Sequence, residues 1–462
     1  MKIFRIASHL CIAAASLLTL PTHASDLLTV WTSAQERDPG FRAALTQEAV
    51  GEAQREQAQS LWNPSVFVSA FGGAASNYSS TREAYFRTPG STSDDVRFNT
   101  SVYLGAAAQA SITALKPLFD KTREASARQL GLAAEISDLG KQIARQHLAR
   151  SVVERYVDVV IAQEALQLHE VHEEAVRRAD NELRKRRALR DVSQMDVHES
   201  AQRLSMLAAQ KVHLQTELEI ARLALKDLSG VDSLPPRMQR SASVLSPLNL
   251  QKIVANLALG HPELRAYDLQ HQIAQYEAQK FYLGARSAKV DFIAQASADV
   301  LSGPGDYGSS AGRLGADQRV GVQITMPLST GGLNVAKQRE ALAIAEKALA
   351  DRARAALALE QQARAAWQML NSFPASISAL ESALTSARQR LLETRKAHAN
   401  GARSTLELLA AEAAVVDAEK QLILEQANHA RSWARLQAAA GVMEDKDFHK
   451  IQSVLRNKPW AN

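Results

Sequence analysis

One short string in this 462-residue chain has the residue types of a metal site. His169-Glu170-Val171-His172 places two imidazoles and a carboxylate within four residues. Zinc-dependent hydrolases instead carry H-E-x-x-H, whose two histidines lie four positions apart on one helix face. Here the histidines are three positions apart, and acidic neighbours on a solvated helix account for the string. We therefore expect no metal at this string.

The glycine-rich stretches offer no catalytic site either. Residues 302–315 and 330–332 lack the Lys-Ser/Thr pair of a phosphate-binding loop, and they lie at strand ends. No Ser-His-Asp set can be proposed from the spacing of these residue types. The sequence predicts a protein that is not an enzyme and takes no cofactor.

The first 24 residues have the pattern of an export signal. Lys2 and Arg5 give a positive start, residues 10–20 form an apolar core, and Thr22-His23-Ala24 offers small residues for cleavage. The core is too short for a membrane anchor, which needs about 20 residues. The only cysteine, Cys11, lies in this core, so we expect an exported chain without a disulfide, a cysteine metal site or a lipid anchor. This combination indicates the Gram-negative envelope.

Charge and hydrophobicity argue against two other classes of protein. The net charge is only +5, with a pI of about 9.2, and basic residues gather at 177–187. Acidic residues interleave with them and no aromatic residue stands among them, which favours a solvated helix face over a site for nucleic acid. No later stretch has 18 consecutive apolar residues, so we expect no membrane-spanning helix.

The chain repeats itself once. Short strings recur in the same order at offsets of 223, 210 and 211 residues. A unit of about 210 residues is longer than a solenoid repeat of ~20–50 residues, so it indicates two copies of one structural half. The matching strings are 38–43 with 261–266, Pro117-Leu118 with Pro327-Leu328, 190–193 with 401–404, and 196–197 with 407–408.

Each half ends in a pair of long helices. Strong helix formers dominate, and the breaks carry capping residues: Ser193 in the first half, Gly401 and Ser404 in the second. At ~1.5 Å per residue the longest helix would reach ~100 Å, so partner helices must cover it as in a coiled-coil wall. Pro374 should kink or interrupt one helix. The expected helices are 118–189, 194–229, 332–399 and 404–440.

Before each helical pair, apolar residues recur at every second position instead of at helical spacing. Val320, Val322 and Ile324 alternate with smaller or polar residues, and similar runs begin near 66, 102 and 290. We expect four strands of about 10 to 13 residues. They would form hairpins at about 65–113 and 289–329, with loops near 72–97 and 303–315.

Strands of this length suit a membrane, which needs ~9–11 residues per strand. The alternative is a soluble two-sheet sandwich. Four strands cannot close a membrane barrel, since the smallest have eight, and an open edge in lipid costs several kcal/mol for each unpaired group. Three copies would supply twelve strands, enough for a hollow interior.

An ordered set of short motifs resembles a known family. The motifs are Asp38-Pro39 with Arg42, Leu118-Phe119-Asp120, Asp196-Val197, 322–328 with Gly331-Gly332, and 401–403 with 406–409. In their order and duplication they resemble the TolC-like outer-membrane factors, the exit ducts of tripartite efflux pumps and type I protein secretion systems.

The resemblance implies a mainly α fold with a β-barrel part. Duplicated long α-helical hairpins would form a periplasmic α-barrel, and four strands per chain would form one third of a 12-stranded trimeric outer-membrane β-barrel. The chain would divide into a signal peptide (1–24), a first repeat (25–229), an equatorial linker (230–250), a second repeat (251–441) and an equatorial tail (442–462).

The resemblance also assigns a gate at the periplasmic end. By position, the polar links that close the duct look like Asp196, Arg403 and His398, and Asp196 would pair with Arg403 by a charge-assisted bond. The family has two acids, three residues apart, at the entrance. This chain has Glu407 and then Ala410, so a trimer would carry a ring of three carboxylates and bind multivalent cations less tightly.

The two helix-hairpin turns are where a periplasmic adaptor docks in the family. They are Arg190, Asp191, Val192 and Ser193 in the first half, and Gly401, Ala402, Arg403 and Ser404 in the second. The family usually has glycine where this chain has Arg190. A left-handed residue other than glycine costs roughly 1 kcal/mol, so we expect the first turn to differ in shape.

The implied function is a passive exit duct in the cell outer membrane. Its partners would be two further copies, a periplasmic adaptor protein, an inner-membrane ABC or RND transporter and outer-membrane lipid. The sequence leaves open whether the cargo is a protein toxin or small drugs. One alternative is a periplasmic adaptor or structural coiled-coil protein, but that function would not explain the four alternating strands. Another is a secreted enzyme, but the sequence offers no catalytic site.

Overall fold

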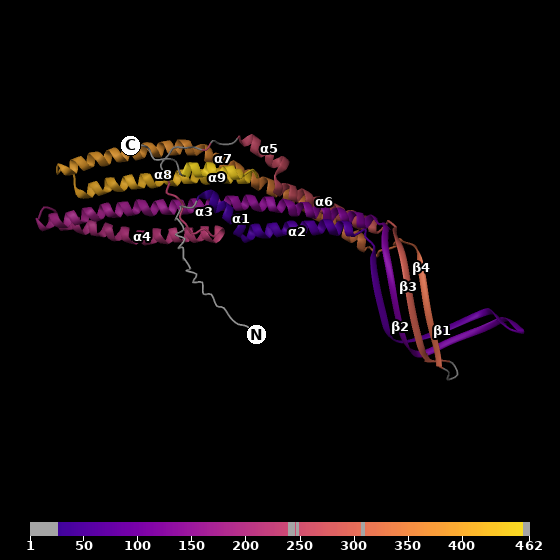
Figure 1. Cartoon of the computed structure of the whole chain (residues 1–462). Helices are drawn as coiled ribbons and strands as arrows, with labels where there is room; N and C mark the ends of the chain where they lie inside the picture. Colours follow the sequence, from indigo (N-terminus) through magenta and orange to yellow (C-terminus); the bar gives the residue numbers. More distant parts are fainter. Residues whose placement is uncertain (1–25, 239–244, 246–248, 306–309, 456–462) are drawn as a thin grey trace, which may run out of the picture. The chain divides into compact units, whose positions relative to one another are not determined.

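The computed structural model describes residues 26–238, 245, 249–305 and 310–455 (Figure 1). The expected signal peptide lies outside these residues, as does part of the expected equatorial linker. The described residues fall into two compact units. The hairpin unit holds the residues up to Arg42, Ala144–Asn256 and those from Leu359 onward, and the sheet unit holds Ala43–Ile143 and Leu257–Ala358. Each unit takes segments from both sequence repeats, so the repeats are not separate bodies.

The sheet unit contains a four-stranded antiparallel sheet among its described residues. Its strands are β1 (Ser65–Thr88), β2 (Ser91–Phe119), β3 (Lys289–Pro304) and β4 (Ser310–Thr325), in the order β1-β2-β3-β4. Both predicted hairpins are present. The first and last strands of this order, β1 and β4, pair with a described strand on one side only.

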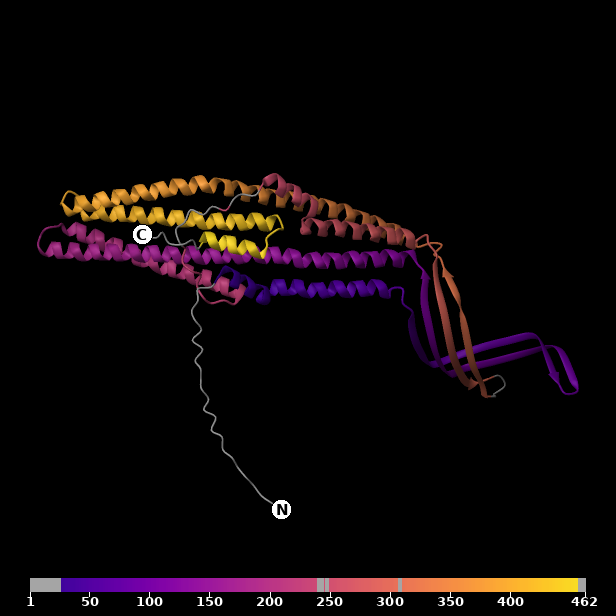
Figure 2. The same cartoon turned by 45° about the horizontal axis from the view of Figure 1, so that its top comes forward.

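The expected strand lengths and loops were wrong. The strands have 24, 29, 16 and 16 residues, and the expected loop at 72–97 is largely a paired ribbon that turns at Gly90, where φ is +95°. Most of the second expected loop, 303–315, also belongs to strands. Glycine, asparagine and serine suggested a loop, but the backbone N–H and carbonyl groups of β1 and β2 pair through this segment despite the low strand propensity of its side chains. Figure 2 shows the β1–β2 ribbon extending beyond β3 and β4.

The register separates the sheet into an apolar and a polar face. Ala114, Ala294 and Val320 are neighbours on one face, and Gln295 lies opposite Arg319 on the other. Because side chains alternate along a strand, this register places the apolar residues of neighbouring strands on the same face of the sheet.

The helices of the sheet unit are α2 (Pro39–Ser60), α6 (Pro262–Gly284) and the first parts of α3 and α7. Small residues fill the space between them, and Ala134 and Ala341 are almost fully buried. A Cβ on Gly51 would lie 2.9 Å from the Cβ of Ser137, so α2 and α3 approach closely at a glycine. Surface ion pairs join the helices at Lys141–Glu48 and Arg265–Glu135.

The four long helices lie within one or two residues of the expected bounds, except that α3 starts three residues late. They are α3 (Lys121–Ala188), α4 (Gln194–Ser229), α7 (Leu333–Ala399) and α8 (Thr405–Ala439). Pro374 does not interrupt α7. Leu370, Phe373 and Ile377 around it are buried, and their packing outweighs the one hydrogen bond that proline removes. None of the described helices is both long and apolar enough to cross a membrane.

Shorter helices close the core of the hairpin unit. They are α1 (Leu27–Arg37), α5 (Leu250–Gly260, partly in this unit) and α9 (Asp445–Leu455) in the expected tail. Trp31 of α1 stacks on Phe448 of α9 with ring centroids 4.7 Å apart. Its indole Nε1 donates to Asp445 Oδ1 at 2.9 Å, and Arg145 of α3 donates to the same oxygen. The first and last described helices are thus held together on α3.

We predict that this stacked pair anchors the C-terminal helix. Trp31→Ala should destabilise the hairpin unit by about 3–5 kcal/mol, because a fully buried indole leaves a cavity. Trp31→Phe keeps a ring and loses mainly the bond to Asp445, so it should cost about 1 kcal/mol. Thermal unfolding followed by circular dichroism compares the two. Equal losses would show that the stacking contributes nothing beyond the hydrogen bond.

Candidate functional site

Every site residue that the sequence suggested lies in one of the two turns that join the long helices or in the helical turn beside it. In Figures 1 and 2 both turns lie at the same end of the hairpin unit. Arg190 has φ +61° in the first turn and Gly401 has φ +73° in the second. The two residues therefore have the same left-handed backbone.

The hydrogen bonds of the turns also correspond. In the first turn, the N–H of Arg190 donates to the carbonyl of Arg187 at 2.9 Å, and that of Asp191 to Arg186 at 2.9 Å. In the second, Gly401 donates to His398 at 2.9 Å and Ala402 to Ala397 at 2.8 Å. The expectation that the first turn differs in shape was wrong. These bonds satisfy the last carbonyls of the helix, and the arginine takes the strained conformation that they require.

Each second helix of a hairpin begins with the same capping box. The N–H of Asp196 donates to Ser193 Oγ at 3.2 Å, and the N–H of Ser193 donates back to the Asp196 carboxylate at 3.2 Å. Ser404 and Glu407 repeat this exchange at 3.2 and 2.8 Å. Asp196 and Glu407 are thus equivalent residues, although the resemblance gave one to the gate and the other to the entrance ring.

A third correspondence crosses each turn. His398 Nε2 lies 3.1 Å from Thr405 Oγ1, and Arg187 Nε donates to Gln194 Oε1 at 3.0 Å. Both pairs are seven residues apart and are related by the offset of 211. Arg187 is therefore the first-half counterpart of the expected gate residue His398. Arg187 is not among the residues predicted from the sequence, although the offset of 211 residues alone points to it.

The expected bond between Asp196 and Arg403 is not made within the described part of one chain. Arg403 instead pairs with Glu407, four residues ahead. The N–H of Ser404 and the Arg403 guanidinium hold the pKa of Glu407 below its usual value, so this exposed carboxylate is ionised at neutral pH. Within one chain, Arg403 therefore pairs with Glu407, and Asp196 bonds to Ser193. Pairing of Asp196 with Arg403 across copies stays a prediction.

Glu407 and Arg403 share a groove between α7 and α8. The groove has a volume of about 470 Å³, and Ala410 lines it at the position where the family has its second acid. Glu393 of α7 lines the same groove, bonded to Lys396 at 3.0 Å. A second carboxylate is therefore present near Glu407, but it comes from the other helix. Sequence spacing along α8 could not reveal it.

The two hairpins use equivalent arginines differently. Arg177 and Arg184 of α3 pair with Glu173 and Asp180 on their own helix. Their counterparts at the offset of 211, Arg388 and Arg395 of α7, pair across to α8. The partners are Glu419 at 2.7 Å and Glu412 at 3.1 Å.

In the first hairpin the links between helices are buried. Asp180, 4% exposed, accepts a hydrogen bond from Ser200, which is fully buried on α4. Burial opposes ionisation of Asp180, but the bonds from Arg184 and Ser200 keep its pKa below the ordinary value. Lys211 of α4 likewise reaches Glu173 at 3.3 Å. The interleaved charges of this segment had predicted only a solvated helix face.

The His169–His172 string does not gather ligands. His169 is buried with Nε2 2.8 Å from the carbonyl oxygen of Leu207, and burial lowers the pKa of His172. No group of three or more histidine, cysteine, aspartate or glutamate residues in the described chain is placed to hold a metal ion.

Comparisons with known proteins cover most of the chain. The family described as outer membrane efflux protein matches residues 30–231 and 257–442. The chain is 27% identical to the alkaline protease secretion protein AprF of Pseudomonas aeruginosa, over 98% of this chain and 92% of AprF. It is 21% identical to the outer membrane protein TolC of Vibrio cholerae, over 96% of this chain and 97% of TolC. Its fold is that of the Campylobacter jejuni CmeC outer membrane channel, with a TM-score of 0.72 at 14% identity over 94% and 91% of the two chains.

We predict that the left-handed backbone of Arg190 lowers the stability of the first hairpin. Arg190→Gly should stabilise the first hairpin by about 1 kcal/mol, because glycine adopts positive φ without a steric penalty and keeps the backbone N–H. Asp191→Gly, in the same turn without positive φ, is the matched control and should not stabilise. Chemical denaturation of the two variants tests this, and equal effects would contradict the strain.

We predict that Asp180 makes the first hairpin sensitive to acid. Its depressed pKa contributes stability that is present above its unfolded pKa of about 3.9 and is lost as the pH falls through the folded value. Asp180→Asn should cost about 1–3 kcal/mol near neutral pH and flatten the stability profile below pH 4. Unfolding at a series of pH values measures this. A variant profile parallel to that of the wild type would assign the acid sensitivity elsewhere.

Proposed function

The chain belongs to the outer membrane efflux protein family, and we propose that three copies of it form a passive exit duct through the outer membrane. The helical part lies in the periplasm. The observation that carries the trimer is the sheet, whose described strands leave β1 and β4 at open edges. In lipid these edges need partners, and the β1 and β4 strands of neighbouring copies supply them.

The helices support the same assembly. On α4, large apolar side chains face away from the rest of the chain, with Met206, Val212 and Ile220 all more than 60% exposed. No part of the chain that the structure describes covers this row. Neighbouring hairpins in a ring of helices would bury it and complete the expected α-barrel.

The proposed cargo is an unfolded protein in a type I secretion system. The support is the similarity to AprF, which is named for secretion of alkaline protease, along 98% of the chain. A small-molecule efflux cargo is the second candidate, supported by the family description. The test supplies this chain to cells that lack their own exit protein and measures secretion of a protease passenger. Secretion would support the protein cargo, and its absence would favour the small-molecule cargo.

The energy and the selection of cargo are assigned to partners. A periplasmic adaptor would dock on the two turns, 190–193 and 401–404, and an inner-membrane ABC or RND transporter would drive transport. The protein itself would catalyse no reaction. The alternative of a periplasmic adaptor does not fit, because the family match includes both strand pairs and both helical hairpins.

The gate would form where the turns of three copies meet. Asp196, Arg403 and His398 would link neighbouring copies, and three Glu407 carboxylates would ring the entrance. Capping boxes fix Asp196 and Glu407 at the first turn of their helices, so both carboxylates lie at defined positions. Opening would then require the hairpins to move apart rather than these side chains to rotate.

Conductance in planar bilayers tests the duct and its entrance together. The protein should insert as discrete conducting steps, and a trivalent cation should block it weakly, because Ala410 stands where the family has the second acid of its entrance ring. Glu407→Gln should raise the blocking concentration about tenfold, whereas Glu393→Gln, in the same groove, should change it little. Absence of conducting steps would refute the duct, and equal effects of the two variants would refute the ring.

A further inference from the structure

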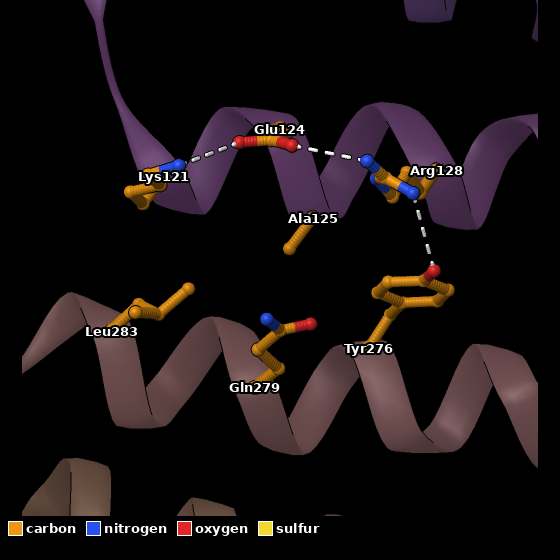
Figure 3. Close-up of a pocket in the computed structure, with 7 residues that line it drawn as sticks. All are labelled: Lys121, Glu124, Ala125, Arg128, Tyr276, Gln279 and Leu283. Atoms are coloured by element: carbon orange, nitrogen blue, oxygen red, sulfur yellow. Dashed lines mark hydrogen bonds and ion pairs between the residues drawn. The ribbon is translucent and has the colours of Figure 1, made fainter.

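A second groove lies in the sheet unit, where the chain leaves the sheet and enters the helices. It lies between the start of α3 and the end of α6 and has a volume of about 410 Å³. Figure 3 shows Lys121, Glu124 and Arg128 in a row along α3, with Tyr276 of α6 at one end. No residue expected to act in the gate or in adaptor docking contributes to it.

The row alternates in charge. Glu124 accepts from Lys121 Nζ at 3.3 Å through one carboxylate oxygen and from Arg128 Nη2 at 3.2 Å through the other. Arg128 Nη1 also lies 3.5 Å from Tyr276 Oη. The bonds from Lys121 and Arg128 lower the pKa of Glu124, so it is ionised. All three charged side chains are 44–57% exposed, so they are accessible to a ligand.

The groove begins where the sheet ends. Phe119 is the last residue of β2, and Lys121 is the first of α3, with its Nζ 5.6 Å from the centre of the Phe119 ring. On the apolar face of the sheet, the exposed Lys116 lies opposite Phe292. Apolar side chains thus give way to a lysine–aromatic pair within five residues of the groove.

The connection from α6 to β3 also pairs a basic residue with an aromatic ring. Before β3 starts, the Arg286 guanidinium stacks 4.2 Å from the Tyr282 ring centre, and Tyr282 is 45% exposed. Aromatic rings with lysine or arginine beside them are typical of the level where hydrocarbon meets head groups. If the strands span the membrane as proposed above, the groove lies at that level.

We propose that this groove binds the head group of phosphatidylethanolamine. The lipid phosphate bonds to Lys121 and Arg128, and the primary ammonium bonds to Glu124. The inference rests on the proposed membrane position of the sheet, and it adds a lipid site that holds the first turn of α3 at the membrane surface.

The sign pattern selects this head group over others. A purely anionic head group would meet the Glu124 carboxylate between the two cations, whereas phosphoethanolamine carries both signs. Choline has the same charges, but its quaternary nitrogen donates no hydrogen bond to a carboxylate. The groove should therefore prefer phosphatidylethanolamine to phosphatidylcholine by up to about fivefold, the range of an exposed charged pair.

Native mass spectrometry of the purified, detergent-solubilised protein tests the site. It is titrated separately with phosphatidylethanolamine, phosphatidylcholine and phosphatidylglycerol. We expect tightest binding of phosphatidylethanolamine, loss of that preference in Glu124→Gln, and weaker binding of all three lipids in Lys121→Gln with Arg128→Gln. Matched controls are Glu48→Gln and Lys141→Gln, an equally exposed ion pair on α2 and α3, which should behave as wild type.

Equal binding of the three lipids, a preference for phosphatidylglycerol, or control variants that match the groove variants would overturn the proposal. The same preparations are also inserted into planar bilayers. A wild type that conducts but binds the three lipids equally would refute the lipid site and leave the duct standing. Failure of the wild type to conduct would count against the duct itself.

Discussion

A β-sheet that lies in lipid must leave no backbone N–H or carbonyl unpaired. This single requirement governs the rest of the molecule. The described strands form a sheet with two open edges, so one chain alone cannot satisfy the requirement. Partner copies can, and their number then sets the ring of helices beneath. Long helices with alanine-rich contacts and uncovered apolar rows on α4 are what a chain needs when its core is shared with its neighbours.

The duplication shows which parts of a helical hairpin are constrained. A left-handed residue, a capping box and a side-chain bond across the turn recur in both halves, although Arg190 replaces glycine and Arg187 replaces histidine. The contacts between the helices diverge instead. Asp180 and Ser200 form a buried polar link where the second half has Leu391 and Ala411. Turn geometry is thus retained, while the links that hold each hairpin together are different.

Local patterns were sufficient to predict the helices and insufficient for the strands and the site. Capping residues such as Ser193 and Gly401 mark a helix end by a bond within a few residues, so the ends could be read directly. The ribbon at 72–97 mixes glycine, serine and asparagine with aromatic residues and has no such mark. The partner of Arg403 also depends on distance in space. Glu407, rather than Asp196, lies within ion-pair distance of Arg403. Glu393 lines the same groove from the neighbouring helix α7, and no sequence pattern on α8 indicates this.

In the proposed assembly, one chain supplies a third of a closed cylinder. Electron microscopy of the purified protein in lipid nanodiscs measures this directly. We expect particles of three copies around an open axis, with β4 of each copy paired to β1 of the next and twelve strands in the membrane. Single copies, or a sheet that closes without a neighbour, would contradict it.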